Sequence, residues 1–119
     1  MLAQVLASPI EVIIRDSCPS IHVFGARETT APAGMGTAGV VVNLITQAHP
    51  GATSEAINYP ACGGQSACGG VSYGDSAKQG VAAVVSAVNS FNSRCPNTQL
   101  VLVGYSQVCW LPRVKEEKC

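Results

Sequence analysis

The residues best suited to chemistry lie in Gly104–Gln107, near the end of the sequence. Four apolar residues, Leu100–Val103, precede them and predict a strand buried on both faces. A strand followed at once by Gly-x-Ser is typical of a nucleophile elbow, in which a sharp turn exposes a serine hydroxyl. Ser106 would then attack an acyl carbonyl, and the backbone N–H of the next residue would stabilise the oxyanion. The usual spelling is G-x-S-x-G, and Val108 stands where the second glycine is expected.

A serine nucleophile needs a base, which is usually a histidine within hydrogen-bond reach. In hydrolases with this elbow the acid and the histidine follow the serine, but only Glu116 and Glu117 provide acidic side chains after Ser106, and no histidine follows. His22 lies inside a short apolar segment and is predicted to be a packed strand residue. His49 lies in a helix-ending turn and is predicted to be on the surface. Neither histidine is therefore a favoured base.

A glycine-rich segment, Gly34–Gly39, spells G-x-G-x-x-G. A dinucleotide-binding fingerprint begins directly after a strand, whereas roughly eight loop residues intervene here. The segment is better interpreted as a glycine-rich entry into a helix, and no cofactor is expected.

Composition limits the classes of partner. The 119 residues suit one domain, 47% are hydrophobic, 12% are charged and the formal net charge is zero. The sequence has no basic patch, which argues against nucleic acid. No apolar stretch approaches the roughly 18 residues of a membrane span. Neither nucleic acid nor membrane is therefore expected as a partner.

The six cysteines favour disulfides and an oxidising compartment. None forms a Cys-x-x-Cys pair, and neither histidine has the spacing of a metal ligand, so no metal site is expected. Six cysteines allow about 15 pairings, and their spacing alone does not decide among them.

Hydrophobic patterning predicts the order β-α-β-α-β. The predicted elements are strands at Ile21–Gly25, Ala56–Tyr59 and Leu100–Val103, and helices at Val40–Ala48 and Ser72–Ser93. Such an order calls for parallel strands with right-handed crossovers and helices covering the sheet. A 2-1-3 strand order would leave the last strand as an exposed apolar edge, which predicts poor solubility or partial folding of these residues alone.

Each predicted helix has an apolar face, and the long helix begins with a capping box of Ser72 and Asp75. In the first helix the face expected to be buried consists of Val41, Leu44, Ile45 and Ala48. In the second it consists of Ala77, Val81, Val84, Val85, Val88 and Phe91.

The two ends of the chain differ from its middle. Residues 1–16 are interpreted as a degraded leader with a short pro-segment, with an extra strand at Glu11–Ile14 as the alternative. Residues 108–119 form a tail of different composition, with five charged side chains.

Three ordered blocks resemble the fungal cutinase and acetylxylan esterase family. They are Ser17–Ala31, Ala56–Gly64 and Val103–Gln107, and the glycine-rich loop Cys62–Gly70 is closer to the acetylxylan esterase branch. The resemblance covers 17–107 as the N-terminal part of an esterase domain. Because it stops abruptly at Val108, we hypothesise that 108–119 derive from a retained intron or a misplaced exon boundary.

The resemblance implies a secreted, extracellular serine esterase without a cofactor, monomeric at full length. Its fold would be a three-layer α/β sandwich with a doubly wound parallel sheet, of which only the N-terminal β-α-β-α-β half is present. Ser106 would be the nucleophile, and Thr29 and Gln107 would form the oxyanion hole. The implied disulfides are Cys18–Cys95 and Cys62–Cys68, which leaves Cys109 and Cys119 unassigned.

The implied substrate is acetylated xylan or a similar short acyl ester of the plant cell wall. Without the family's histidine and aspartate, these 119 residues are expected to be inactive or severely impaired. The alternatives are a cutinase acting on longer acyl esters of cutin, and a secreted, disulfide-stapled binding protein without catalysis.

Overall fold

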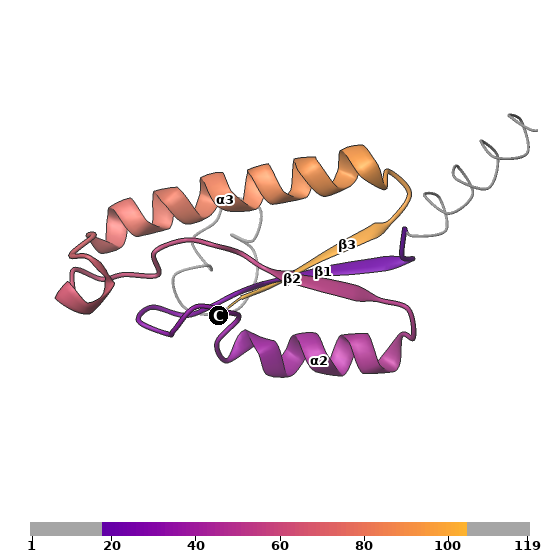
Figure 1. Ribbon diagram of the computed structural model, residues 1–119, viewed down its shortest axis with the longest axis horizontal. Coiled ribbons are helices and arrows are strands. Elements are labelled where there is room, and N and C mark those ends of the chain that lie inside the picture. The colour runs from indigo at the N-terminus through magenta and orange to yellow at the C-terminus, as the bar shows by residue number, and fades with distance from the viewer. Residues whose placement is uncertain (1–17, 105–119) are drawn as a thin grey trace, which may run out of the picture.

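The computed structural model describes residues 18–104, which form three layers (Figure 1). Strands β1 (Ile21–Ala26), β2 (Thr53–Ala56) and β3 (Gln99–Gly104) make a parallel sheet in the order β2-β1-β3. Helix α2 (Ala38–Ala48) covers one face of this sheet and helix α3 (Tyr73–Arg94) covers the other. The predicted fold class, element order and strand order are confirmed.

Strand β1 is the centre of the described sheet, because it pairs with both other strands. His22 lies opposite Thr53 on β2 and opposite Leu100 on β3. The strand is apolar on both sides, and Phe24 is fully buried. This is the pattern expected of a strand with a helix on each face.

The second strand was predicted three residues too late. It runs over Thr53–Ala56 and is mostly exposed, as an edge strand of the described sheet. The Ile57 N–H still donates to the Gly25 carbonyl at 2.8 Å, after which the chain leaves the sheet. Ile57 and Tyr59 are buried in the cluster under α3, so the apolar alternation marks a buried connection instead of the strand itself.

Helix α2 begins two residues before its predicted start and buries a different face. Ala38 and Val42 are buried, whereas Val40 and Leu44 are 63% and 61% exposed. The prediction that Leu44 and Ala48 lie on the buried face is therefore wrong, because both are exposed. Because apolar residues occupy most positions of this helix, their period does not define a single face.

Helix α3 begins after its predicted cap. The Ser72 hydroxyl accepts a hydrogen bond from the Asp75 N–H at 3.1 Å. Val84 and Phe91 are buried as predicted, but Val85 is 49% exposed, so its placement on the buried stripe is wrong. Two small residues complete the buried face instead, Ser76 and Gly80.

Two disulfides fasten the ends of these elements. Cys18 is bonded to Cys95, with 5.6 Å between their Cα atoms, which joins the residues before β1 to the end of α3. Cys62 is bonded to Cys68, with 5.7 Å between their Cα atoms, across the glycine-rich loop. These are the two pairs that the family resemblance implies.

Several predicted features lie outside the described residues: Ser106, Gln107, Val108, Cys109, Cys119 and the segments 1–16 and 108–119. Within residues 18–104, no helix is long and apolar enough to cross a membrane. The same residues contain no group of three or more His, Cys, Asp or Glu side chains arranged to hold a metal ion.

Candidate active site

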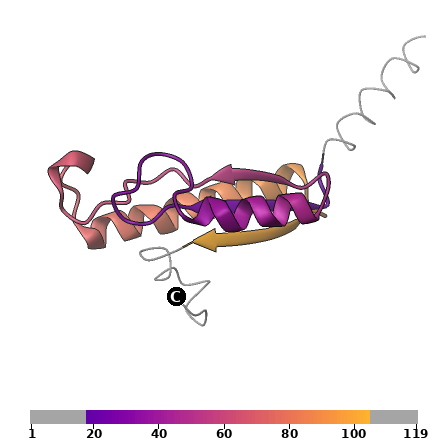
Figure 2. The ribbon, with the colours of Figure 1, turned by 90° about the horizontal axis from the view of Figure 1, so that it is seen from below.

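The carboxyl ends of β1 and β3 lie side by side, with Ala26 paired to Gly104. The loop that follows β1 carries Thr29, and Ser106 is two residues beyond Gly104 in the sequence. Figure 2 shows this end of the sheet, where the loops after β1 and β2 also gather. The loop that carries Thr29 therefore begins beside the last described residue of β3, at the carboxyl edge of the sheet.

The loop after β1, residues 27–37, is held against the chain that follows β2. The Thr30 N–H donates to the Ala61 carbonyl at 2.6 Å. Both residues have positive φ, +69° at Thr30 and +51° at Ala61, which is uncommon for residues other than glycine. Strained backbone of this kind often occurs where a loop must be positioned for function.

Arg27 and Tyr59 connect the same two segments. Arg27 Nε donates to the Ala31 carbonyl at 2.9 Å, and Arg27 Nη2 donates to the Pro60 carbonyl at 3.3 Å. The Tyr59 hydroxyl donates to the Arg27 carbonyl at 2.6 Å. Burial raises the pKa of Tyr59, which keeps its phenol protonated as a donor. No local sequence pattern marks these two residues, because their contacts join segments that are distant in the chain.

The carboxylate of Glu28, in the loop after β1, contacts Thr37 at the start of α2. Its Oε1 accepts from the Thr37 N–H at 2.9 Å, and its Oε2 accepts from the Thr37 hydroxyl at 2.6 Å. These hydrogen bonds lower the pKa of the Glu28 carboxyl. The helix entry at Gly34–Gly39 therefore already faces a carboxylate, which agrees with its interpretation as a structural segment.

The loop after β2 is closed by the Cys62–Cys68 disulfide and contains the short 3₁₀ helix η1 (Ser66–Cys68). The Gly63 N–H donates to Gln65 Oε1 at 2.8 Å, and the Cys62 N–H donates to the Ser76 hydroxyl at 2.9 Å. A cavity of about 590 Å³ lies between this loop and the loop after β1. Its lining comprises Arg27, Thr30, Ala31, Pro32, Ala33, Pro60, Gln65, Ala67 and Cys68.

His22 is a packed strand residue, as predicted. It is only 4% exposed, and its ring stacks on Phe91 with 3.9 Å between ring centroids. Its nitrogens lie 2.6 Å from Thr53 Oγ1 and 2.8 Å from Glu55 Oε1. Because it is the second residue of β1, it lies away from the carboxyl edge that leads to Thr29.

His49 is exposed, as predicted, at the end of α2 opposite to the loop after β1 (Figure 1). The described structure thus brings neither histidine to the edge where Thr29 lies.

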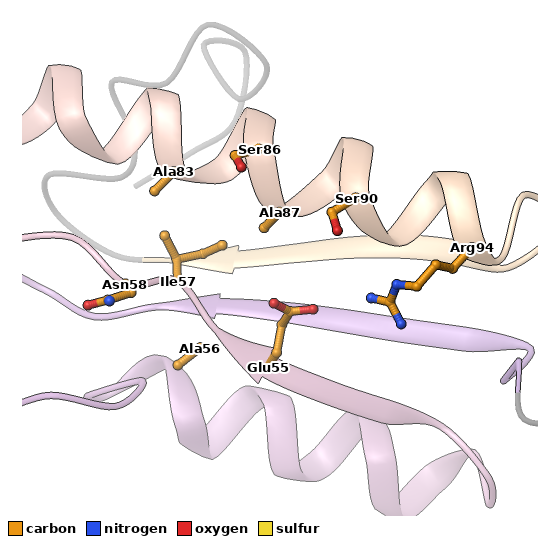
Figure 3. Close-up of a pocket in the computed structure, with 9 residues that line it drawn as sticks. All are labelled: Glu55, Ala56, Ile57, Asn58, Ala83, Ser86, Ala87, Ser90 and Arg94. Carbon is orange, nitrogen blue, oxygen red and sulfur yellow. The ribbon is translucent and has the colours of Figure 1, made fainter.

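A second groove, of about 350 Å³, lies between β2 and α3 (Figure 3). Glu55 points into it from β2, and Ser86, Ser90 and Arg94 face it from α3. The Arg94 guanidinium lies 5.1 Å from the centre of the Phe91 ring. This groove is flanked by side chains of both charges and lies apart from the loops at the carboxyl edge.

Comparison with known proteins identifies the family. A family model described as cutinase matches residues 17–113, which begins at the predicted boundary and extends past Gln107. The chain belongs to the cutinase family. Its loop after β1 and its Gly-Tyr-Ser-Gln segment both lie inside the matched region.

Cutinase-family relatives are highly similar over the shared part. The chain is 70% identical over 107 residues to cutinase 11 of Verticillium dahliae and 67% identical over 102 residues to acetylxylan esterase 2 of Talaromyces purpureogenus. It covers 36% and 44% of these two proteins, and thus less than half of their length. A structure of an acetylxylan esterase matches 76% of this chain and 44% of its own, with 70% identity and a TM-score of 0.74.

Proposed function

We propose that this chain carries the nucleophile-bearing part of a carboxylic ester hydrolase that acts on acetyl esters of xylan. Ser106 would attack the ester carbonyl, and the N–H of Gln107 and the Thr29 hydroxyl would stabilise the oxyanion. A base from the remaining part of the enzyme would take the Ser106 proton and give it to the sugar oxygen, which leaves as a hydroxyl group. Water would then hydrolyse the acyl-enzyme to release acetate.

The observation that carries this proposal is the pairing of Ala26 with Gly104. It places the start of the Thr29 loop beside the residue that leads into the predicted elbow. Oxyanion stabilisation requires donors about 3 Å from the developing charge, and neighbouring parallel strands are a direct way to bring two loops to that range. The 67% identity to acetylxylan esterase 2 of Talaromyces purpureogenus supports the acetyl ester as substrate.

A chimera provides the sharpest test, because no histidine or aspartate follows Ser106 in the 119 residues. Residues 18–107 of this chain would be joined to the remaining part of acetylxylan esterase 2 from Talaromyces purpureogenus. We expect the chimera to release acetate from acetylated xylan and to react with a fluorophosphonate probe. We expect the 119 residues alone to hydrolyse far more slowly, because Ser106 has no base.

Three variants of the chimera separate the roles. Ser106→Ala should abolish probe labelling and lower kcat by at least about 10⁴-fold. Thr29→Ala should lower kcat by about 10²–10³-fold, the usual cost of one oxyanion donor. Thr46→Ala, on α2, is the matched control and should retain activity. A folded chimera that neither labels nor hydrolyses would contradict the proposal and favour a binding protein without catalysis.

A cutinase specificity is the second candidate, because cutinase 11 is as similar as the acetylxylan esterases. The ratio of kcat/KM for acetyl and longer acyl esters distinguishes them. A preference of the chimera for acetyl esters supports the first candidate, provided that the parent esterase is measured beside it.

A further inference from the structure

Arg27 is a buried cation without a carboxylate partner among residues 18–104. Arg27 is only 8% exposed. Its Nε and Nη2 donate to two neutral groups, the carbonyls of Ala31 and Pro60. The neighbouring Glu28 carboxylate is bound to Thr37 instead. Within residues 18–104, Glu55 is also occupied, because its Oε1 lies 2.8 Å from His22 Nε2. The Tyr59 ring, whose centre lies 5.4 Å from Arg27 Cζ, adds a cation–π contact. Two neutral carbonyls and an aromatic ring compensate a buried charge only partly, so this position favours an anion.

One nitrogen of the Arg27 guanidinium, Nη1, is available to a ligand. It makes no hydrogen bond to the described residues, and within residues 18–104 no buried side-chain nitrogen or oxygen lacks a partner. Arg27 also lines the 590 Å³ cavity, so a ligand in this cavity would meet the Arg27 side chain.

The rest of the cavity adds a second donor and no negative charge. Gln65 uses its Oε1 to accept from the Gly63 N–H, which leaves its Nε2 donors without a hydrogen bond to the described residues. None of the described lining residues is acidic. The volume lies within the range of about 300–1,000 Å³ that is usual for small-molecule sites.

We propose that this cavity binds the carboxylate of a uronic-acid sugar, through Arg27 Nη1 and Gln65 Nε2. A guanidinium and a carboxylate form charge-assisted hydrogen bonds, which are stronger than neutral ones. The carboxylate part of this inference rests on the burial and open donor of Arg27. The sugar part rests on the proposed function, because a polysaccharide ester bound beside Thr29 would carry neighbouring sugars over the adjacent cavity.

The groove in Figure 3 does not offer the same site. Its arginine, Arg94, is exposed and lies over the Phe91 ring, and the Glu55 carboxylate lines the same groove. An anion there would meet a solvated cation and a nearby negative charge. Arg94→Gln is therefore a suitable control for the loss of an arginine outside the proposed site.

An NMR titration of the 119-residue chain with D-glucuronate, D-glucose and acetate tests the inference. We expect glucuronate to shift the Arg27 Nε–H and Gln65 Nε2–H₂ signals and to bind at least about tenfold more tightly than glucose. We also expect it to bind more tightly than acetate. Equal affinity for glucuronate and glucose would overturn the proposal that the cavity binds a carboxylate. Glucuronate binding no tighter than acetate binding would overturn the proposal that the ligand is a sugar.

Ala67→Glu tests the site without removing the hydrogen bonds of Arg27. Ala67 is exposed and lines the cavity, so a carboxylate there should neutralise the site and weaken glucuronate binding by about tenfold. Ala82→Glu, at an exposed position of α3 outside the cavity, and Arg94→Gln should bind as the unmodified chain does. A folded Ala67→Glu variant with unchanged affinity would overturn the site.

Failure of the proposed esterase function can be distinguished from failure of the proposed carboxylate site. If the esterase chimera is inactive but glucuronate still binds the 119 residues through Arg27, the proposed function fails and the carboxylate site stands. If the chimera is active and its Ser106→Ala variant does not bind glucuronate, the further inference fails alone.

Discussion

The Thr30 N–H donates to the Ala61 carbonyl at 2.6 Å, and both residues hold left-handed backbone. This contact ties the loop that carries Thr29 to the loop that carries the Cys62–Cys68 disulfide. Because side chains other than glycine disfavour this conformation by about 1–2 kcal/mol per residue, the pair represents a local cost in the folded state. The geometry of the predicted oxyanion loop is thus maintained by a long-range contact.

Thr30→Gly should relieve part of that cost. Thr30 is exposed and has a φ of +69°, so glycine there should raise the free energy of unfolding by up to about 1 kcal/mol. Chemical denaturation followed by circular dichroism measures the change. Ala33→Gly is the control: Ala33 is exposed in the same loop without positive φ, and glycine there should lower stability. Equal changes in the free energy of unfolding for the two substitutions would contradict the proposed backbone strain at Thr30.

Gly80 and Gly74 form a matched pair on α3. A Cβ at Gly80 would lie 3.0 Å from Tyr59 Cδ2, whereas a Cβ at Gly74 would meet nothing within 4 Å. Gly80→Ala should therefore lower the free energy of unfolding by about 1–2 kcal/mol despite the helix propensity of alanine. Gly74→Ala should raise it by up to about 1 kcal/mol. Thermal unfolding of both variants checks the difference, and a stabilising Gly80→Ala would show that Tyr59 moves freely.

Glu28 should make stability depend on pH. Its hydrogen bonds with Thr37 lower its pKa in the folded state below the usual value, so the carboxylate stabilises the fold above that usual value. This contribution is lost as the pH falls through the lowered folded-state pKa. Glu28→Gln should therefore reduce stability at neutral pH and weaken the acid dependence below about pH 4.5.

The Thr37→Val background provides the control for Glu28, because it removes the hydroxyl that donates to the carboxylate. In that background the effect of Glu28→Gln should be smaller. An equal effect in both backgrounds would show that the Thr37 hydroxyl is not a cause of the lowered pKa.

His22→Ala should be strongly destabilising. The substitution removes a buried ring that stacks on Phe91 and leaves Glu55 without its histidine partner. We expect a loss of about 3 kcal/mol, similar to that of other buried aromatic truncations. His49→Ala, at an exposed position, should stay within about 0.5 kcal/mol of the unmodified chain. Urea titration measures both, and a similar small effect at both sites would contradict the packing role of His22.

Local sequence signals predicted most of the architecture. The apolar run at Leu100–Val103 predicted β3, and the capping box at Ser72 predicted the start of α3, because each signal depends on residues close in the chain. The alternation at Ala56–Tyr59 misplaced β2, because Ile57 and Tyr59 are buried by α3 and not by strand pairing. The buried face of α2 was also misjudged at Leu44, since apolar residues surround that helix.

The family, the parallel β-α-β-α-β order and the position of Ser106 after β3 can all be predicted from the amino-acid sequence. These features are predictable because motifs and hydrophobic periodicity depend on residues that are close together in the chain. Tertiary structure alone decided that Ala26 lies beside Gly104, that Thr30 is bonded to Ala61, and that Arg27 is buried beside a cavity without a carboxylate partner among residues 18–104. These features arise where segments distant in sequence meet, and which atoms meet there depends on how the two loops pack.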